Sequence, residues 1–106
     1  MRVTIRYVEG CPHWQVADER VHAALARSGH TTADVVHELV DTHENAVRLG
    51  FVGSPTILID GVDPFATADA ARGLACRVYP TTAGPVGCPS VEQLVAELLL
   101  AARNVG

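Results

Sequence analysis

The chain begins with a strand pattern that passes directly into a helix pattern, and this order limits the folds available to it. In residues 2–8 apolar and polar side chains alternate, which is typical of a strand with one face buried. A helical spacing of apolar residues then runs from Trp14 to Ser28, and Gly29 follows as a helix terminator. A second strand reached through this helix should lie parallel to the first, with a right-handed crossover.

Two further elements are predicted in the middle of the chain. Residues 34–40 favour a strand through their valines, although Glu38 and Leu39 leave a helix as the alternative. Residues 41–44 resemble a capping box, in which an acceptor side chain is followed three positions later by Glu. We therefore expect a short helix that ends at Gly50.

Two more strands are predicted beyond this helix. Residues 56–59 end in three consecutive aliphatic side chains, a run that suits a central strand buried on both faces. Residues 76–79 indicate a fourth strand that ends at Pro80, and residues 81–89 indicate a loop rich in Gly, Pro and Thr.

The rest of the C-terminal half divides into an unclear segment and a clear helix. Residues 66–74 are alanine-rich and fit either a short helix or an irregular insertion. Ser90 and Gln93 have the spacing of a second capping box, and a helix with an apolar stripe follows them.

This order of elements, β-α-β-α-β-β-α, predicts an α/β domain. We expect a four-stranded mixed sheet with helices on both faces, its last two strands paired antiparallel. The 106 residues, 48% of them hydrophobic, suffice for one core and are too few for two. We therefore expect a single domain over residues 1–106, with an insertion at about residues 62–75.

Charge and hydropathy argue against several classes of partner. The formal net charge is −4 and no run of Lys or Arg occurs, so neither nucleic acid nor an anionic membrane surface is expected to bind. No apolar stretch approaches the length of a membrane span, and no leader pattern precedes the first strand. These features predict a cytoplasmic protein; they say nothing about its oligomeric state.

Three cysteines are the candidate reactive groups. Cys11 lies where the first strand meets the first helix, and the positive end of a helix favours a thiolate there. We expect its sulfur to be partly exposed in this loop and tuned by His13, with an inert packed thiol as the alternative. Cys76 and Cys88 either resolve a mixed disulfide formed on Cys11, bond to each other, or are plain strand and loop thiols.

Two motifs together resemble the thioredoxin-like superfamily. They are Gly-Cys-Pro-His-Trp at residues 10–14 and Gly-Ser-Pro-Thr-Ile-Leu-Ile-Asp-Gly at residues 53–61. The resemblance implies a three-layer α/β/α sandwich, with Cys11 as the nucleophile, Pro55 as a cis-proline packed against it, and Ser54 meeting the substrate. It places the remaining substrate-binding residues beside Cys11, at Pro12, His13 and Trp14.

One departure from the superfamily pattern bears on function. The second cysteine of the usual dithiol motif is replaced by Trp14, so Cys11 has no resolving partner nearby in sequence. The chain is similar in this to small bacterial thioredoxin-family proteins with a single active-site cysteine.

The leading functional hypothesis is a thiol-dependent redox protein acting through one nucleophilic cysteine. Its substrates would be a protein disulfide, a peroxide or an adduct of a small thiol. The alternatives are an inactive thioredoxin-like binding module and a thiol protein that handles soft metals or organomercurials. We expect no cofactor and no metal site, because Cys-x-His is a poor ligand pattern and the other histidines are scattered.

Overall fold

The computed structural model describes residues 1–67 and 72–103, and its first two elements form as expected. Strand β1 spans Arg2–Tyr7 and helix α1 spans Trp14–Arg27. Strand β2, Asp34–Leu39, follows and excludes the helical alternative for that segment. The remaining elements are α2 (His43–Leu49), β3 (Thr56–Ile59), β4 (Tyr79–Thr81), β5 (Gly84–Val86) and α3 (Val91–Arg103).

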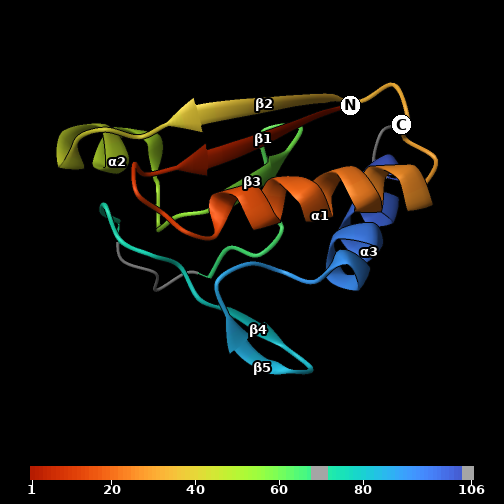
Figure 1. Ribbon diagram of the computed structural model, residues 1–106. Helices are drawn as coiled ribbons and strands as arrows, with labels where there is room; N and C mark the ends of the chain where they lie inside the picture. The colour runs from red at the N-terminus through yellow and green to blue at the C-terminus, as the bar shows by residue number, and fades with distance from the viewer. Residues whose placement is uncertain (68–71, 104–106) are drawn as a thin grey trace.

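The main sheet has three strands in the order β2-β1-β3 (Figure 1). Strand β1 lies parallel to β2 and antiparallel to β3, with Val3 opposite Ile59 and Ile5 opposite Ile57. These four side chains are buried and form the sheet's contribution to the hydrophobic core. Burying such aliphatic side chains is the main stabilising contribution to folding, about 1.5–3 kcal/mol for each side chain.

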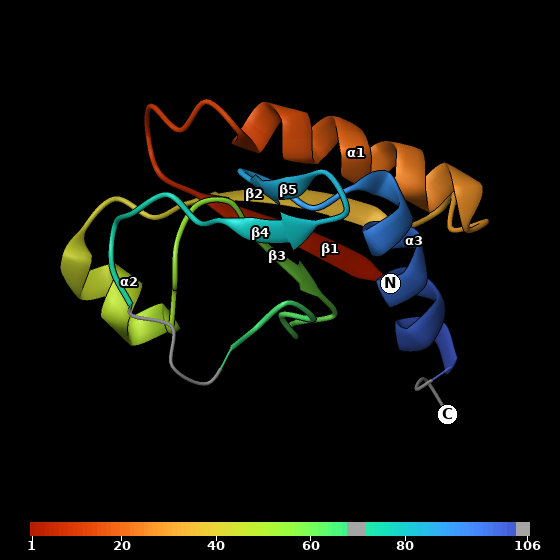
Figure 2. The same ribbon diagram turned by 90° about the horizontal axis from the view of Figure 1, so that it is seen from below.

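Helices α1 and α3 pack on the same face of this sheet (Figure 2). The buried stripe of α1 is the one predicted from its spacing, and Leu94 and Leu98 of α3 complete the core. The capping box of α3 is confirmed in both directions. The N–H of Gln93 donates to Ser90 Oγ at 3.1 Å, and the N–H of Ser90 donates to Gln93 Oε1 at 2.9 Å.

Helix α2 lies beyond the ends of β1 and β2 and has a small core of its own (Figure 1). That core contains Val40, Ala46 and Phe51, all buried. Its cap is Thr42, whose Oγ1 accepts from the N–H of Asn45 at 3.0 Å, so the capping box assigned to residues 41–44 was placed one residue early. Because α1 and α3 share one face and α2 sits at the end, the predicted three-layer sandwich is wrong.

The predicted four-stranded sheet is also wrong. Residues 76–79 do not add a fourth strand: Cys76 makes one isolated bridge to Ser54. Strand β4 instead runs through Pro80, where the predicted strand was to end, and pairs antiparallel with β5 in a separate two-stranded sheet; β5 lies inside the segment predicted to be a loop. Pro80 and Pro85 face each other in this hairpin. Each strand of a two-stranded sheet is an edge strand, where a missing N–H is tolerated. The prediction was wrong because it took proline as the end of a strand.

The expected insertion has no regular element in its described parts, residues 62–67 and 72–75, apart from a bridge between Ile59 and Val62. The alternative of a short helix over 66–74 falls partly on residues 68–71, which lie outside the described residues. Arg77, just after the insertion, holds its first described part: it forms an ion pair with Asp63 at 2.6 Å, and both side chains are largely buried.

No helix within the described ranges has the length and apolar character needed to cross a membrane.

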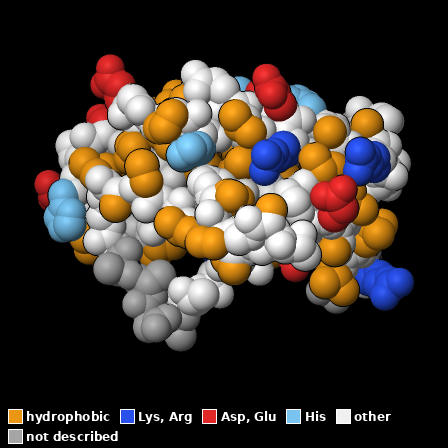
Figure 3. Space-filling model, turned by 60° about the horizontal axis from the view of Figure 1, so that its bottom comes forward, with side chains coloured by type: hydrophobic (Ala, Val, Ile, Leu, Met, Phe, Trp, Pro, Cys, Tyr) orange, Lys and Arg blue, Asp and Glu red, His pale blue; other side chains and the backbone are white. Residues whose placement is uncertain are grey.

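On the side that carries the hairpin, hydrophobic groups are interspersed with basic, acidic and polar ones (Figure 3).

Removing the α3 cap should cost measurable stability. In Ser90→Ala, the N–H of Gln93 loses its acceptor, and we expect the free energy of unfolding to fall by about 1 kcal/mol in urea titrations. Thr31→Ala is the control, because Thr31 is exposed in the turn before β2, and there the change should stay within about 0.5 kcal/mol. Equal effects of the two substitutions would contradict this account of the cap.

Candidate functional site

Cys11 lies in the loop between β1 and α1, two residues before the N-cap residue His13. Its N–H donates to Val8 O at 3.2 Å, which closes a turn directly after the strand. No side chain caps the start of α1, so its first N–H groups keep their partial positive charge. The Cys11 side chain is only 5% exposed, and the expectation of a partly exposed sulfur is therefore wrong.

The loop of Ser54 and Pro55 lies against the loop of Cys11, as predicted. The N–H of Val8 donates to Ser54 Oγ at 3.1 Å, and this bond joins the two loops directly. Ser54 is completely buried, and its peptide bond to Pro55 is cis, as the superfamily resemblance implied. The two stretches that carry that resemblance thus meet in space.

A third segment, residues 75–77, covers Ser54 from the other side. The N–H of Ser54 donates to Ala75 O at 2.7 Å, and the N–H of Arg77 donates to Ser54 O at 2.9 Å. Cys76, between them, is exposed. The backbone groups with which Ser54 was expected to meet a substrate are therefore already paired within the chain.

Arg77 fixes this covering segment, and the sequence did not indicate its role because its partners are distant in the chain. Besides Asp63, its guanidinium donates to Phe65 O at 2.6 Å and lies 4.6 Å from the centre of the Tyr79 ring. Gly53 permits the close approach: a Cβ at Gly53 would lie 2.9 Å from Arg77 Cβ.

Tyr79 is hydrogen-bonded to Pro55. It is buried, and its O–H donates to Pro55 O. Burial raises the pKa of the phenol far above its ordinary value, and the charge of Arg77 opposes that rise. Tyr79 therefore remains a neutral hydrogen-bond donor at physiological pH.

Cys88 is the second buried thiol of the site. It is 4% exposed, free, and part of the main core. Burial raises the pKa of its thiol, Arg20 opposes the rise, and a negative charge on Cys11 adds to it. Cys11 and Cys88 are thus close enough to interact electrostatically, although 77 positions separate them in the chain.

His13 links the Cys11 loop to the hairpin end. A Cβ placed on Gly87 would lie 2.4 Å from ring carbons of His13, so the imidazole packs on the backbone just before Cys88. Trp14 points elsewhere: it stacks on Tyr7 with ring centres 4.3 Å apart and meets the edge of His37. Pro12 is exposed beside them. The structure thus brings together Cys11, His13, Ser54, Pro55 and Cys88, with Cys76 on the outside.

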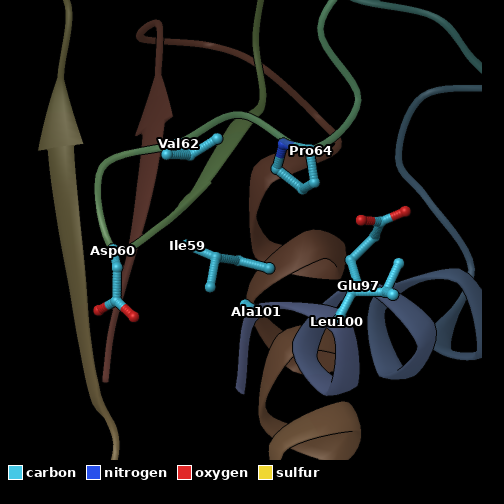
Figure 4. Close-up of a pocket in the computed structure, with 7 residues that line it drawn as sticks. All are labelled: Ile59, Asp60, Val62, Pro64, Glu97, Leu100 and Ala101. Atoms are coloured by element: carbon cyan, nitrogen blue, oxygen red, sulfur yellow. The ribbon is translucent and has the colours of Figure 1, made fainter. Parts of the chain in front are cut away.

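A hollow of about 430 Å³ lies at the other end of the sheet (Figure 4). Ile59, Val62 and Leu100 make much of its wall. Asp60, on its rim, accepts the N–H of Arg2 at 2.8 Å, which places the hollow beside the start of β1, whereas Cys11 follows the end of that strand. This hollow is therefore separate from the thiols.

Within the described ranges, no three His, Cys, Asp or Glu side chains gather as a metal site would require. Comparison with known proteins adds no relative: no family model, no curated protein and no solved structure matches the chain.

The buried phenol should make stability sensitive to alkaline pH. The unfolded chain releases the Tyr79 proton near its ordinary pKa, about 10, while the folded chain retains it, so stability falls as pH rises above about 10. Urea titrations of the reduced protein between about pH 8 and 11 should show a weaker alkaline loss in Tyr79→Phe.

Tyr7→Phe is the matched control, because it removes a phenol that is only half-buried and keeps Tyr79. It should retain the alkaline loss of the wild type. The same loss in Tyr79→Phe as in the wild type would show that Tyr79 is not its source.

Proposed function

We propose that this chain is a thiol-dependent redox protein in which Cys11 attacks small disulfides and Cys88 completes the reaction. The observation that carries the proposal is the pair of free, buried thiols on adjoining segments, since His13 of the Cys11 loop packs on Gly87, the residue before Cys88. The start of α1 lies beside Cys11, and the loop of Ser54 and Pro55 is hydrogen-bonded to the loop that carries Cys11, through Val8. The likeness of residues 10–14 and 53–61 to thioredoxin-like proteins supports the same chemistry.

The proposed reaction is thiol–disulfide exchange in two steps. The Cys11 thiolate attacks one sulfur of the substrate disulfide, the S–S bond breaks, and the other half leaves as a thiolate that takes up a proton. Cys88 then loses its proton and attacks the Cys11 sulfur, which releases the first half as a second thiol. The substrate gains two electrons and two protons, and the two cysteines become a disulfide that an external thiol reduces.

Burial favours Cys88 over Cys76 as the resolving cysteine. Cys88 is buried with Cys11 and responds to its charge, whereas Cys76 is exposed on the segment that covers Ser54. Cys76 remains the second candidate through its bridge to Ser54.

Burial also bears on the size of the substrate. With Cys11 and Cys88 at 5% and 4% exposure, the disulfide of a folded protein meets neither sulfur unless the structure around the thiols opens. A small disulfide needs a much smaller opening, which is why we favour it over a protein disulfide.

The test follows reduction of bis(2-hydroxyethyl) disulfide, a small neutral disulfide, by the fully reduced protein. Cys11→Ser should slow the reaction at least about tenfold, because the attacking sulfur is lost. Cys88→Ser should stop after one step, and intact mass should show half of the disulfide attached. Cys76→Ser is the control and should react at the wild-type rate. A Cys11→Ser protein as fast as the wild type would overturn the proposal.

A binding module is the second candidate, and one observation favours it: Trp14 stands where the second cysteine of the dithiol motif would be. In that case a bound partner is retained equally by the wild type and by Cys11→Ser, and neither reduces the disulfide.

A further inference from the structure

A second surface feature, distinct from the hollow of Figure 4, lies next to Cys88. It is a groove of about 320 Å³ between α1, the β4–β5 hairpin and the start of α3. Arg20 and Arg27 of α1 form one side, Thr82 and Val86 of the hairpin another, and Ser90 lies before α3. Its volume is in the range of sites that hold small molecules.

The groove is locally basic in a chain that is acidic overall. The formal charge of the chain is −4, yet Arg20 and Arg27 both line this groove, and Glu92 is the acidic residue among its described lining. Figure 3 views this side of the molecule and shows basic groups on it with an acidic group nearby. A negatively charged ligand is therefore attracted to this groove, although the molecule as a whole carries a net negative charge.

Both guanidinium groups keep donors for a ligand. Arg20 Nη1 donates to Pro89 O at 3.1 Å, and Arg27 Nη1 lies 3.7 Å from Glu92 Oε1. The second contact is loose, and both of its side chains are mostly exposed. Since a guanidinium carries five N–H donors, most remain available, and their planar arrangement matches a carboxylate.

The groove adjoins the thiol pair at two points. Arg20 holds the carbonyl of Pro89, the residue after Cys88, and its charge opposes the rise in the pKa of that thiol. Val86, in the groove wall, precedes Gly87, against which His13 packs from the Cys11 loop. The groove and the thiol pair therefore both adjoin the chain around residues 87–89.

We propose that this groove binds the carboxylate end of a small anionic disulfide and so selects the substrate of the thiol pair. The inference rests on the proposed function, because it names the substrate class for the same site. It adds Arg20 and Arg27 as binding residues.

The experiment compares three small disulfides that differ in charge: dithiodiglycolate (anionic), bis(2-hydroxyethyl) disulfide (neutral) and cystamine (cationic). Each rate is divided by the rate of a free reference thiol with the same disulfide, which removes differences in intrinsic reactivity. In the wild type we expect the anionic disulfide to react fastest after this correction, with an advantage that shrinks as salt is added.

Arg27→Gln is the decisive variant, because Arg27 is exposed and is not placed in the reaction itself. It should lower the ratio of the rate with the anionic disulfide to the rate with the neutral one about fivefold to tenfold. Arg48→Gln, the same change on exposed α2, is the matched control and should alter neither rate. Equal corrected rates for the three disulfides would overturn the proposal that the groove binds the anionic disulfide. So would an anionic preference that survives in Arg27→Gln. Neither result would contradict the thiol chemistry.

A measurement without redox chemistry separates failure of the groove from failure of the proposed function. Thiodiglycolate has the same two carboxylates and a thioether in place of the disulfide. NMR titration should show shifts at residues of the groove in the wild type, and binding weakened about fivefold to tenfold in Arg27→Gln. If none of the disulfides reacts, this titration alone tests whether the groove binds the carboxylates. No binding of thiodiglycolate by the wild type would overturn the inference.

Discussion

The antiparallel pairing of β1 with β3 is the constraint on which the site depends. Because the two strands run in opposite directions, the end of β1 meets the beginning of β3, with Arg6 opposite Thr56. The loop that carries Cys11 and the loop that carries Ser54 and Pro55 therefore emerge at the same edge. The hydrogen bond from the Val8 N–H to Ser54 Oγ then joins them. Two stretches more than forty positions apart thus form one site.

Sequence patterns predicted what depends on local periodicity and missed what depends on distant contacts. The strands of the main sheet, the three helices and the cap at Ser90 follow from spacing and side-chain chemistry. The hairpin was missed because Pro80 and Pro85 look like strand breakers, yet a two-stranded sheet tolerates them. The burial of Cys11 and the anchoring of Arg77 were also missed, because both arise only when separate segments pack together.

The site combines a reactive position with restricted access. Cys11 lies at the start of a helix, but the surrounding segments leave it almost no exposed surface. The covering segment is held through its hydrogen bonds to Ser54 and through the buried Arg77–Asp63 ion pair. Removing one partner of such a pair is strongly destabilising, because the other charge stays buried without a partner. Such a site suits small reactants better than large ones. A basic groove beside Cys88 then offers a way to choose among them by charge.

The central claim is that Cys11 and Cys88 work as one thiol pair. The most direct measurement is disulfide mapping by mass spectrometry after oxidation of the reduced protein with one equivalent of a mild oxidant, followed by digestion with the free thiols blocked. The account predicts a peptide pair linked through Cys11 and Cys88, with Cys76 recovered as the blocked thiol. A link between Cys11 and Cys76, or oxidation that leaves Cys11 and Cys88 unlinked, would contradict it.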